Sequence, residues 1–154
     1  MFFWIAPKQG AAYRDKEQFG EKVKLRFPKS TEDIDEAYKC FCFGRYTASV
    51  FHLMRVMEIA VQGFGVSAGA TVPSDKPWGN ILQGIDAAVR MMPRGTPQEK
   101  KRHEDFSEVA AYLHHVKDAW RNTTMHPKNT YTEEEAEHLL SNVKTFMRGL
   151  AELI

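Results

Sequence analysis

Apolar residues recur at spacings of three and four along the chain from residue 30 onward. This spacing places them on one face of an α-helix, because a helix completes a turn every 3.6 residues. Four such stripes predict four helical segments. They are the stripes Phe43 to Phe64, Trp78 to Met92, Phe106 to Trp120 and Ala136 to Leu150.

The first helix should begin near Ser30, followed by Asp33 as an acidic residue in its first turn. Glycine weakens a helix interior by about 1 kcal/mol, so we expect Gly44 to bend this helix. Gly63 and Gly65 close the stripe and are expected to stop it. These signals predict one long, bent helix that ends near residue 63.

The third and fourth helices have clearer starts. Thr96 is followed by Pro97 and Glu99, which is the pattern of a capping box with proline at the first helical position. Thr132 and Glu135 repeat the capping box before the last stripe. The four helices together predict an all-α fold, an antiparallel helical bundle of four to five helices.

Residues 1–29 lack a helical stripe. Val23, Leu25 and Phe27 alternate with polar residues, a pattern typical of a strand. We therefore expect an irregular or short-strand N-terminal arm over 1–29 and a helical domain over 30–154.

Charge and composition narrow the possible partners. Twenty-one Lys and Arg against twenty Asp and Glu give a net charge of +1, which excludes a broadly basic surface but permits a local basic cleft. No apolar run reaches the 18 residues of a membrane-spanning helix, so we expect no membrane contact. Two cysteines, Cys40 and Cys42, without a zinc-type spacing fit a reducing cytoplasm, and a cytoplasmic location is expected.

One short segment carries a pattern suited to chemistry. Arg121, Asn122 and His126 precede Pro127, which disfavours helical backbone at the residue before it. The helix should therefore end near residues 122–125, and a histidine on the departing chain can fold back toward Arg121. Arginine binds phosphate through a forked set of donors, and histidine moves protons near neutral pH. This pair is typical of phosphodiester cleavage, and RNA can supply its own 2′-hydroxyl nucleophile without a metal.

The motif Arg121-Asn122-x-x-x-His126 at a helix end resembles that of the HEPN superfamily of small α-helical domains. The run Gly44–Glu58 resembles the first core helix of such domains, and Lys117–Asn122 resembles the approach to the motif. The resemblance extends over about residues 30–154. Many of these domains are metal-independent endoribonucleases of toxin–antitoxin and phage-defence systems.

The resemblance implies a role for each motif residue. Arg121 would contact the scissile phosphate, His126 would move protons, and Asn122 would orient the pair. It also implies a homodimer in which two such sites meet in one cleft, single-stranded RNA as substrate, and an antitoxin or other protein as a possible partner. No metal or other cofactor is expected. The alternative is a non-catalytic HEPN-like module that dimerises or binds a partner.

Four more residues are candidates for substrate binding. Lys128 and Lys117 flank the motif, and His52 and Arg55 lie one turn apart on the first predicted helix, at the rim of the expected cleft. The alternative for His52 and Arg55 is an ordinary polar stripe in which Arg55 pairs with Glu58.

Overall fold

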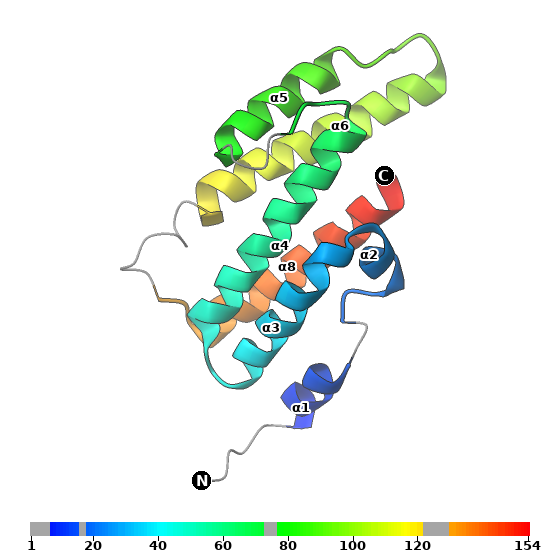
Figure 1. The fold of residues 1–154 in the computed structure, drawn as a ribbon. Helices are drawn as coiled ribbons and strands as arrows, with labels where there is room; N and C mark the ends of the chain where they lie inside the picture. The colour runs from blue at the N-terminus through cyan, green and yellow to red at the C-terminus, as the bar shows by residue number, and fades with distance from the viewer. Residues whose placement is uncertain (1–6, 16–17, 73–76, 122–129) are drawn as a thin grey trace.

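In the computed structural model of the chain, residues 7–15, 18–72, 77–121 and 130–154 are described. Within these ranges the chain is a bundle of α-helices (Figure 1), which confirms the all-α prediction. The long helices are α3 (Thr31–Cys42), α4 (Tyr46–Ser67), α5 (Trp78–Arg90), α6 (Pro97–Val116) and α8 (Glu133–Leu153). The short elements are α1 (Pro7–Arg14), α2 (Glu21–Arg26), the 3₁₀ turn η1 (Pro28–Ser30) and the π-helical turn η2 (Lys117–Arg121).

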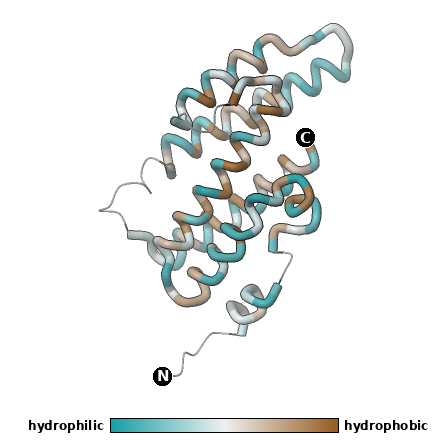
Figure 2. Tube along the Cα trace, in the orientation of Figure 1, coloured by the Kyte–Doolittle hydropathy of each residue, from teal (hydrophilic) through white to brown (hydrophobic). Residues whose placement is uncertain are grey.

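Helix α4 lies at the centre of the bundle, in contact with α3, α5 and α8 (Figure 1). Its hydrophobic side chains supply much of the core, and Figure 2 shows apolar residues along its length. Phe64 of α4 packs against Phe106 of α6, with ring centroids 5.0 Å apart. Tyr112 of α6 stacks on Phe146 of α8 at 4.6 Å. These aromatic contacts connect α6 to α4 and to α8.

Helices α4 and α8 begin at the same end of the bundle. The Tyr46 hydroxyl at the start of α4 donates to a Glu133 carboxylate oxygen at 2.8 Å. The Tyr131 amide donates to the Thr47 hydroxyl at 3.0 Å. These two bonds hold the residues that precede α8 against the first turn of α4.

The strand-like alternation near the N-terminus was a wrong prediction. Residues 21–26 form helix α2, and another short helix, α1, precedes it. Val23 and Phe27 are buried in the core, whereas Leu25 is 71% exposed. Residues four apart share a helix face, so Val23 and Phe27 fit a helical turn as well as they fit alternation.

The predicted first helix is two helices. Helix α3 ends at Cys42 and α4 begins at Tyr46, so the chain breaks where a bend was expected. Gly44 has a φ of +69°, in the left-handed region that disfavours other residues. The turn therefore reverses the chain, and α3 packs back along α4.

Gly63 and Gly65 do not stop α4, contrary to the prediction, because the helix continues to Ser67. They are positions of close packing. A Cβ on Gly63 would lie 2.8 Å from a ring carbon of Phe27, and a Cβ on Gly65 would lie 2.5 Å from a methyl of Val72. Glycine is present here because neighbouring side chains occupy the space that a Cβ would need.

Both predicted capping boxes are confirmed. The Thr96 hydroxyl accepts from the Glu99 amide at 3.2 Å, and the Thr132 hydroxyl accepts from the Glu135 amide at 3.3 Å. In each box the threonine amide in turn donates a hydrogen bond to the glutamate carboxylate. These bonds satisfy amide groups that a helix start otherwise leaves unpaired.

Helix α5 ends at Arg90, two residues before the predicted end.

Replacing Gly63 by alanine should lower the free energy of unfolding by about 1–3 kcal/mol, because the added Cβ overlaps the buried ring of Phe27. Gly149→Ala is the matched control in α8, where a Cβ meets open space. That change should raise the free energy of unfolding by up to about 1 kcal/mol, through helix propensity alone. Urea unfolding of both variants measures the difference, and equal stabilisation by the two would contradict the close packing at residue 63.

Candidate functional site

Helix α6 continues without a break into η2, which ends at Arg121. A single π-helical turn at the end of an α-helix is uncommon and is found frequently at functional sites. The Arg121 side chain lies outside the described part of the structure, as do Asn122, His126 and Lys128. Of the motif, the structure therefore describes only the backbone of Arg121. That His126 folds back toward Arg121 stays a prediction.

Lys117 opens η2 and has a nearby anionic partner. Its ammonium nitrogen lies 3.1 Å from a carboxylate oxygen of Asp118, whose side chain is largely exposed. Such surface pairs contribute at most about 1 kcal/mol and exchange easily with other ions. The Lys117 side chain itself is 25% exposed, so part of it reaches solvent.

His52 and Arg55, both on α4, contact the same carboxylate, that of Asp33 on α3. The Arg55 Nε donates to Asp33 Oδ1 at 2.7 Å, and His52 Nδ1 lies 2.9 Å from the same oxygen. Asp33 is only 6% exposed. Burial alone would raise the pKa of Asp33, but the bonds from Arg55 and His52 outweigh it and hold that pKa below its ordinary value.

Asp33 is the residue that sequence reasoning missed. Its position in the first turn of α3 was predicted, but its contacts were not, because its partners lie 19 and 22 residues further along the chain. Arg55 donates a hydrogen bond to Asp33, whereas the partner considered from the sequence was Glu58. The charge of Glu58 also acts on Arg55 and raises its pKa.

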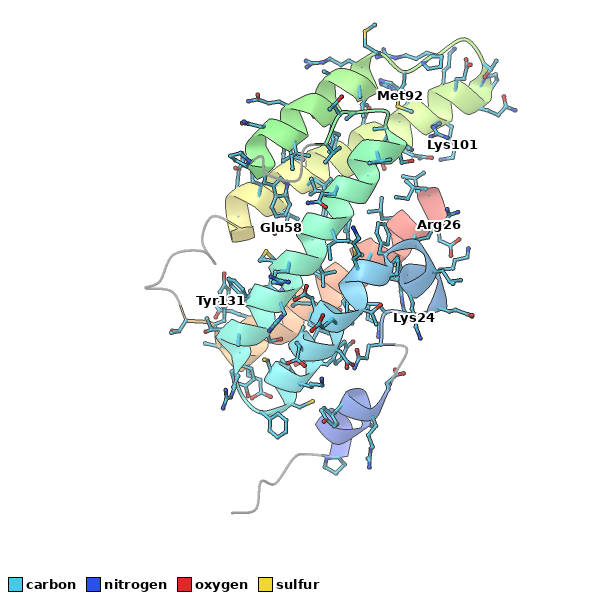
Figure 3. The ribbon with its side chains drawn as sticks, in the orientation of Figure 1. Lys24, Arg26, Glu58, Met92, Lys101 and Tyr131 are labelled. Carbon is cyan, nitrogen blue, oxygen red and sulfur yellow. The ribbon has the colours of Figure 1, made fainter. Side chains whose placement is uncertain are left out.

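The charges around Arg55 are mostly negative. The bond to Asp33 and its charge raise the pKa of Arg55, and the charges of Glu58 and Glu32 add to this effect. Figure 3 shows Glu58 half-way along α4 and Tyr131 beside its first turns. This part of α4 is therefore not a concentrated positive surface, and a phosphate would meet three carboxylates near one guanidinium.

Two cysteines and a histidine among the described residues lie outside the predicted site. Burial raises the pKa of the Cys40 and Cys42 thiols, so neither is an activated nucleophile. His114 Nε2 lies 2.9 Å from a carboxylate oxygen of Asp86, a contact that joins α6 to α5.

Among the residues placed by the structure, no three or more His, Cys, Asp or Glu side chains gather as a metal site would require. None of the helices described is both long and apolar enough to span a membrane.

Comparison with known proteins identifies the family. The family model for the HEPN domain matches residues 23–153, most of the chain. The chain belongs to the HEPN family. No curated protein and no solved structure gives a significant match.

The HEPN match agrees with the resemblance carried by the Arg121-Asn122-x-x-x-His126 motif. It begins at Val23, inside α2, so it includes most of α2 and the turn η1 that precedes α3, but not α1. Val23 and Phe27 are buried in the same core as the long helices. HEPN domains commonly dimerise. Membership of the family supports a general role for this chain as a nuclease, an RNA-related module or another HEPN-type module.

In this HEPN domain, Asp33→Asn should make stability less sensitive to acid. The folded pKa of Asp33 lies below its ordinary value of 3.8, so the ionised carboxylate stabilises the fold above that pH. This contribution is lost as the pH falls through the folded pKa. The free energy of unfolding of the wild type should therefore fall more steeply below about pH 5 than that of the variant.

At pH 7 the Asp33→Asn variant should be less stable by about 1–3 kcal/mol, because the buried contacts lose their charge. Urea unfolding across the pH range measures both effects. Glu108→Gln, at an exposed position on α6, is the control and should follow the wild type. Parallel pH profiles for the wild type and Asp33→Asn would show that the carboxylate contributes nothing as an anion.

Proposed function

We propose that this HEPN domain is a metal-independent endoribonuclease that cleaves single-stranded RNA. The observation that carries the proposal is the motif Arg121-Asn122-x-x-x-His126 at the end of the continuous helix α6–η2, in a chain of the HEPN family. The π-helical turn that leads into Arg121 supports it, because such turns are frequent at functional sites.

The proposed reaction uses the substrate's own nucleophile. The 2′-oxygen of a ribose attacks the adjacent phosphorus and gives up its proton to a base, and the bond from phosphorus to the 5′-oxygen breaks. The departing 5′-oxygen takes up a proton. The products are a 2′,3′-cyclic phosphate and a 5′-hydroxyl, so atoms and charge balance without an added reactant.

In this proposal, three residues each have a separate role in the reaction. Arg121 stabilises the negative charge that develops on the phosphorane, as a preorganised cation does in a shielded site. His126 moves the protons, because the ordinary pKa of histidine lies near neutrality. Asn122 orients the two. In a homodimer, the second copy supplies a second histidine, so one can act as base while the other acts as acid.

Lys117 and Lys128 are the proposed cations for the neighbouring phosphates. The side chains of the Lys117–Asp118 pair are 25% and 66% exposed, and in this proposal a phosphate displaces the Asp118 carboxylate. His52 and Arg55 are proposed as weaker contacts, because Asp33 already engages both. Cleavage of cellular RNA by such an enzyme suits a toxin or a phage-defence effector, with an antitoxin or other protein as its control.

The test is cleavage of an end-labelled single-stranded RNA in the presence of EDTA. Arg121→Ala and His126→Ala should each reduce the rate by about 10²–10⁴-fold, since each removes charge stabilisation or proton transfer. Arg90→Ala and His138→Ala are matched controls at exposed positions on α5 and α8, and they should retain the wild-type rate.

A second substrate tests the nucleophile. An RNA with a single 2′-deoxy residue at the cleaved position should resist cleavage there. Equal rates for all five proteins, loss of activity in EDTA, or cleavage at the 2′-deoxy position would refute the mechanism. A chain that dimerises but never cleaves RNA would favour the binding-module alternative.

A further inference from the structure

A groove lies between the second half of α4 and the residues that join α2 to α3. Its volume is about 390 Å³, within the range of ligand-binding clefts, which is roughly 300–1,000 Å³. Val66 in its lining is 69% exposed, so apolar surface of the groove is in contact with water. We call it the η1 groove. Its lining includes Arg26, Phe27, Lys29, Ile59, Val66 and Val72.

Two exposed cations line the η1 groove. Arg26 is the last residue of α2 (Figure 3), and Lys29 is in η1. Neither forms an ion pair with a carboxylate of the described residues, and no described Asp or Glu lines the groove. Two other grooves of the described chain each include an aspartate, Asp35 in one and Asp86 in the other. The η1 groove therefore combines an apolar lining with positive charge that no lining carboxylate offsets.

The turn that carries the two cations is fixed by hydrogen bonds. The Phe27 carbonyl accepts from the Ser30 hydroxyl at 2.7 Å and from the Ser30 amide at 2.9 Å. Both residues are buried, and the Phe27 ring packs closely against Gly63 of α4. Arg26 directly precedes Phe27, and Lys29 directly precedes Ser30. The backbone of both cations is therefore held in place before a ligand arrives, which lowers the entropy cost of binding.

The η1 groove suits an acidic peptide better than a nucleic acid. Single-stranded RNA binds through bases stacked on aromatic side chains and through cations that follow its phosphates. The aromatic ring in the described lining is that of Phe27, which is buried, and the exposed apolar surface is aliphatic. A peptide segment, in contrast, can place an apolar side chain beside Val66 and carboxylates beside Arg26 and Lys29.

We propose that the η1 groove binds a short segment of a partner protein in which a large apolar side chain lies between Asp or Glu residues. The apolar side chain contacts Ile59, Val66 and Val72, and the flanking carboxylates pair with Arg26 and Lys29. Opposite charges orient the segment, and burial of the apolar side chain supplies affinity. This binding does not depend on RNA cleavage, so a chain without nuclease activity should still bind the segment.

Selection from a library of short random peptides displayed on phage tests the chemistry without a known partner. The bait is the full chain, and peptides that also bind the Arg26→Glu/Lys29→Glu double variant are removed. The enriched peptides should carry Asp or Glu on both sides of a large apolar residue. Enrichment of basic or uncharged peptides, or no enrichment over the double variant, would overturn the proposal.

Fluorescence anisotropy with a labelled synthetic copy of the most enriched peptide locates the site. Arg26→Glu and Lys29→Glu should each raise Kd by at least about tenfold, because each turns an attraction into a repulsion. Lys24→Glu is the matched control, since Lys24 is an exposed residue of α2 outside the groove lining. It should bind nearly as the wild type does, and circular dichroism should show all three variants folded. Equal losses in the three variants would show that net charge alone matters, and the η1 groove would not be the site.

The apolar contact has its own test with the same peptide. Val66→Ser should raise Kd by about fivefold, because it removes apolar surface that the peptide covers. Met91→Ser is the control, since Met91 is 85% exposed at the end of α5 and does not line the groove. Unchanged affinity of Val66→Ser would place the peptide elsewhere on the chain.

A peptide with every Asp and Glu replaced by Lys tests the charge complementarity. The Arg26→Glu/Lys29→Glu double variant should bind this basic peptide more tightly than the wild type does, and equal binding would contradict the proposed pairing. A short oligouridine RNA is the last competitor. If it displaces the acidic peptide and its own affinity falls in Arg26→Glu, the η1 groove is a nucleic-acid site and the proposal is wrong.

Discussion

The burial of α4 is the constraint on which the rest of this bundle depends. This helix of 22 residues offers apolar side chains on most of its circumference, so each neighbouring helix can bury its own stripe against it. Close approach is possible because Gly63 and Gly65 remove the Cβ atoms where Phe27 and Val72 come nearest. The α3–α4 reversal at Gly44 and the bonds that join Tyr131 and Glu133 to the start of α4 then fix the positions of α3 and α8.

Much of this fold is predictable from local signals. The capping boxes at Thr96 and Thr132 are complete within four residues, so the sequence shows both helix starts directly. The roles of Gly63 and Asp33 are not predictable in the same way. Each depends on a residue that is distant in the chain, Phe27 for the glycine and the α4 pair for the carboxylate. A single sequence read without structure contains no sign of those contacts.

The candidate site likewise has a part that can be predicted from the sequence and a part that depends on tertiary contacts. Residue types and spacing predict Arg121, Asn122 and His126 as site residues, and this stays a prediction within a chain of the HEPN family. The environment of His52 and Arg55 follows only from tertiary packing, which places Asp33 beneath both. A net charge of +1 therefore does not describe any one surface. Its distribution decides where an anion can bind, and the middle of α4 is one of the less favourable places.

The π-helical turn before Arg121 has a geometric consequence. A π turn contains one more residue than an α turn would need, so the backbone at its end, Arg121, is offset by roughly 100° from the α-helical phase of α6. The apolar stripe of α6 is thus not continued in the same phase through η2. Deletion of one residue between 117 and 120 would therefore let the regular α-helical pattern of α6 continue through this turn.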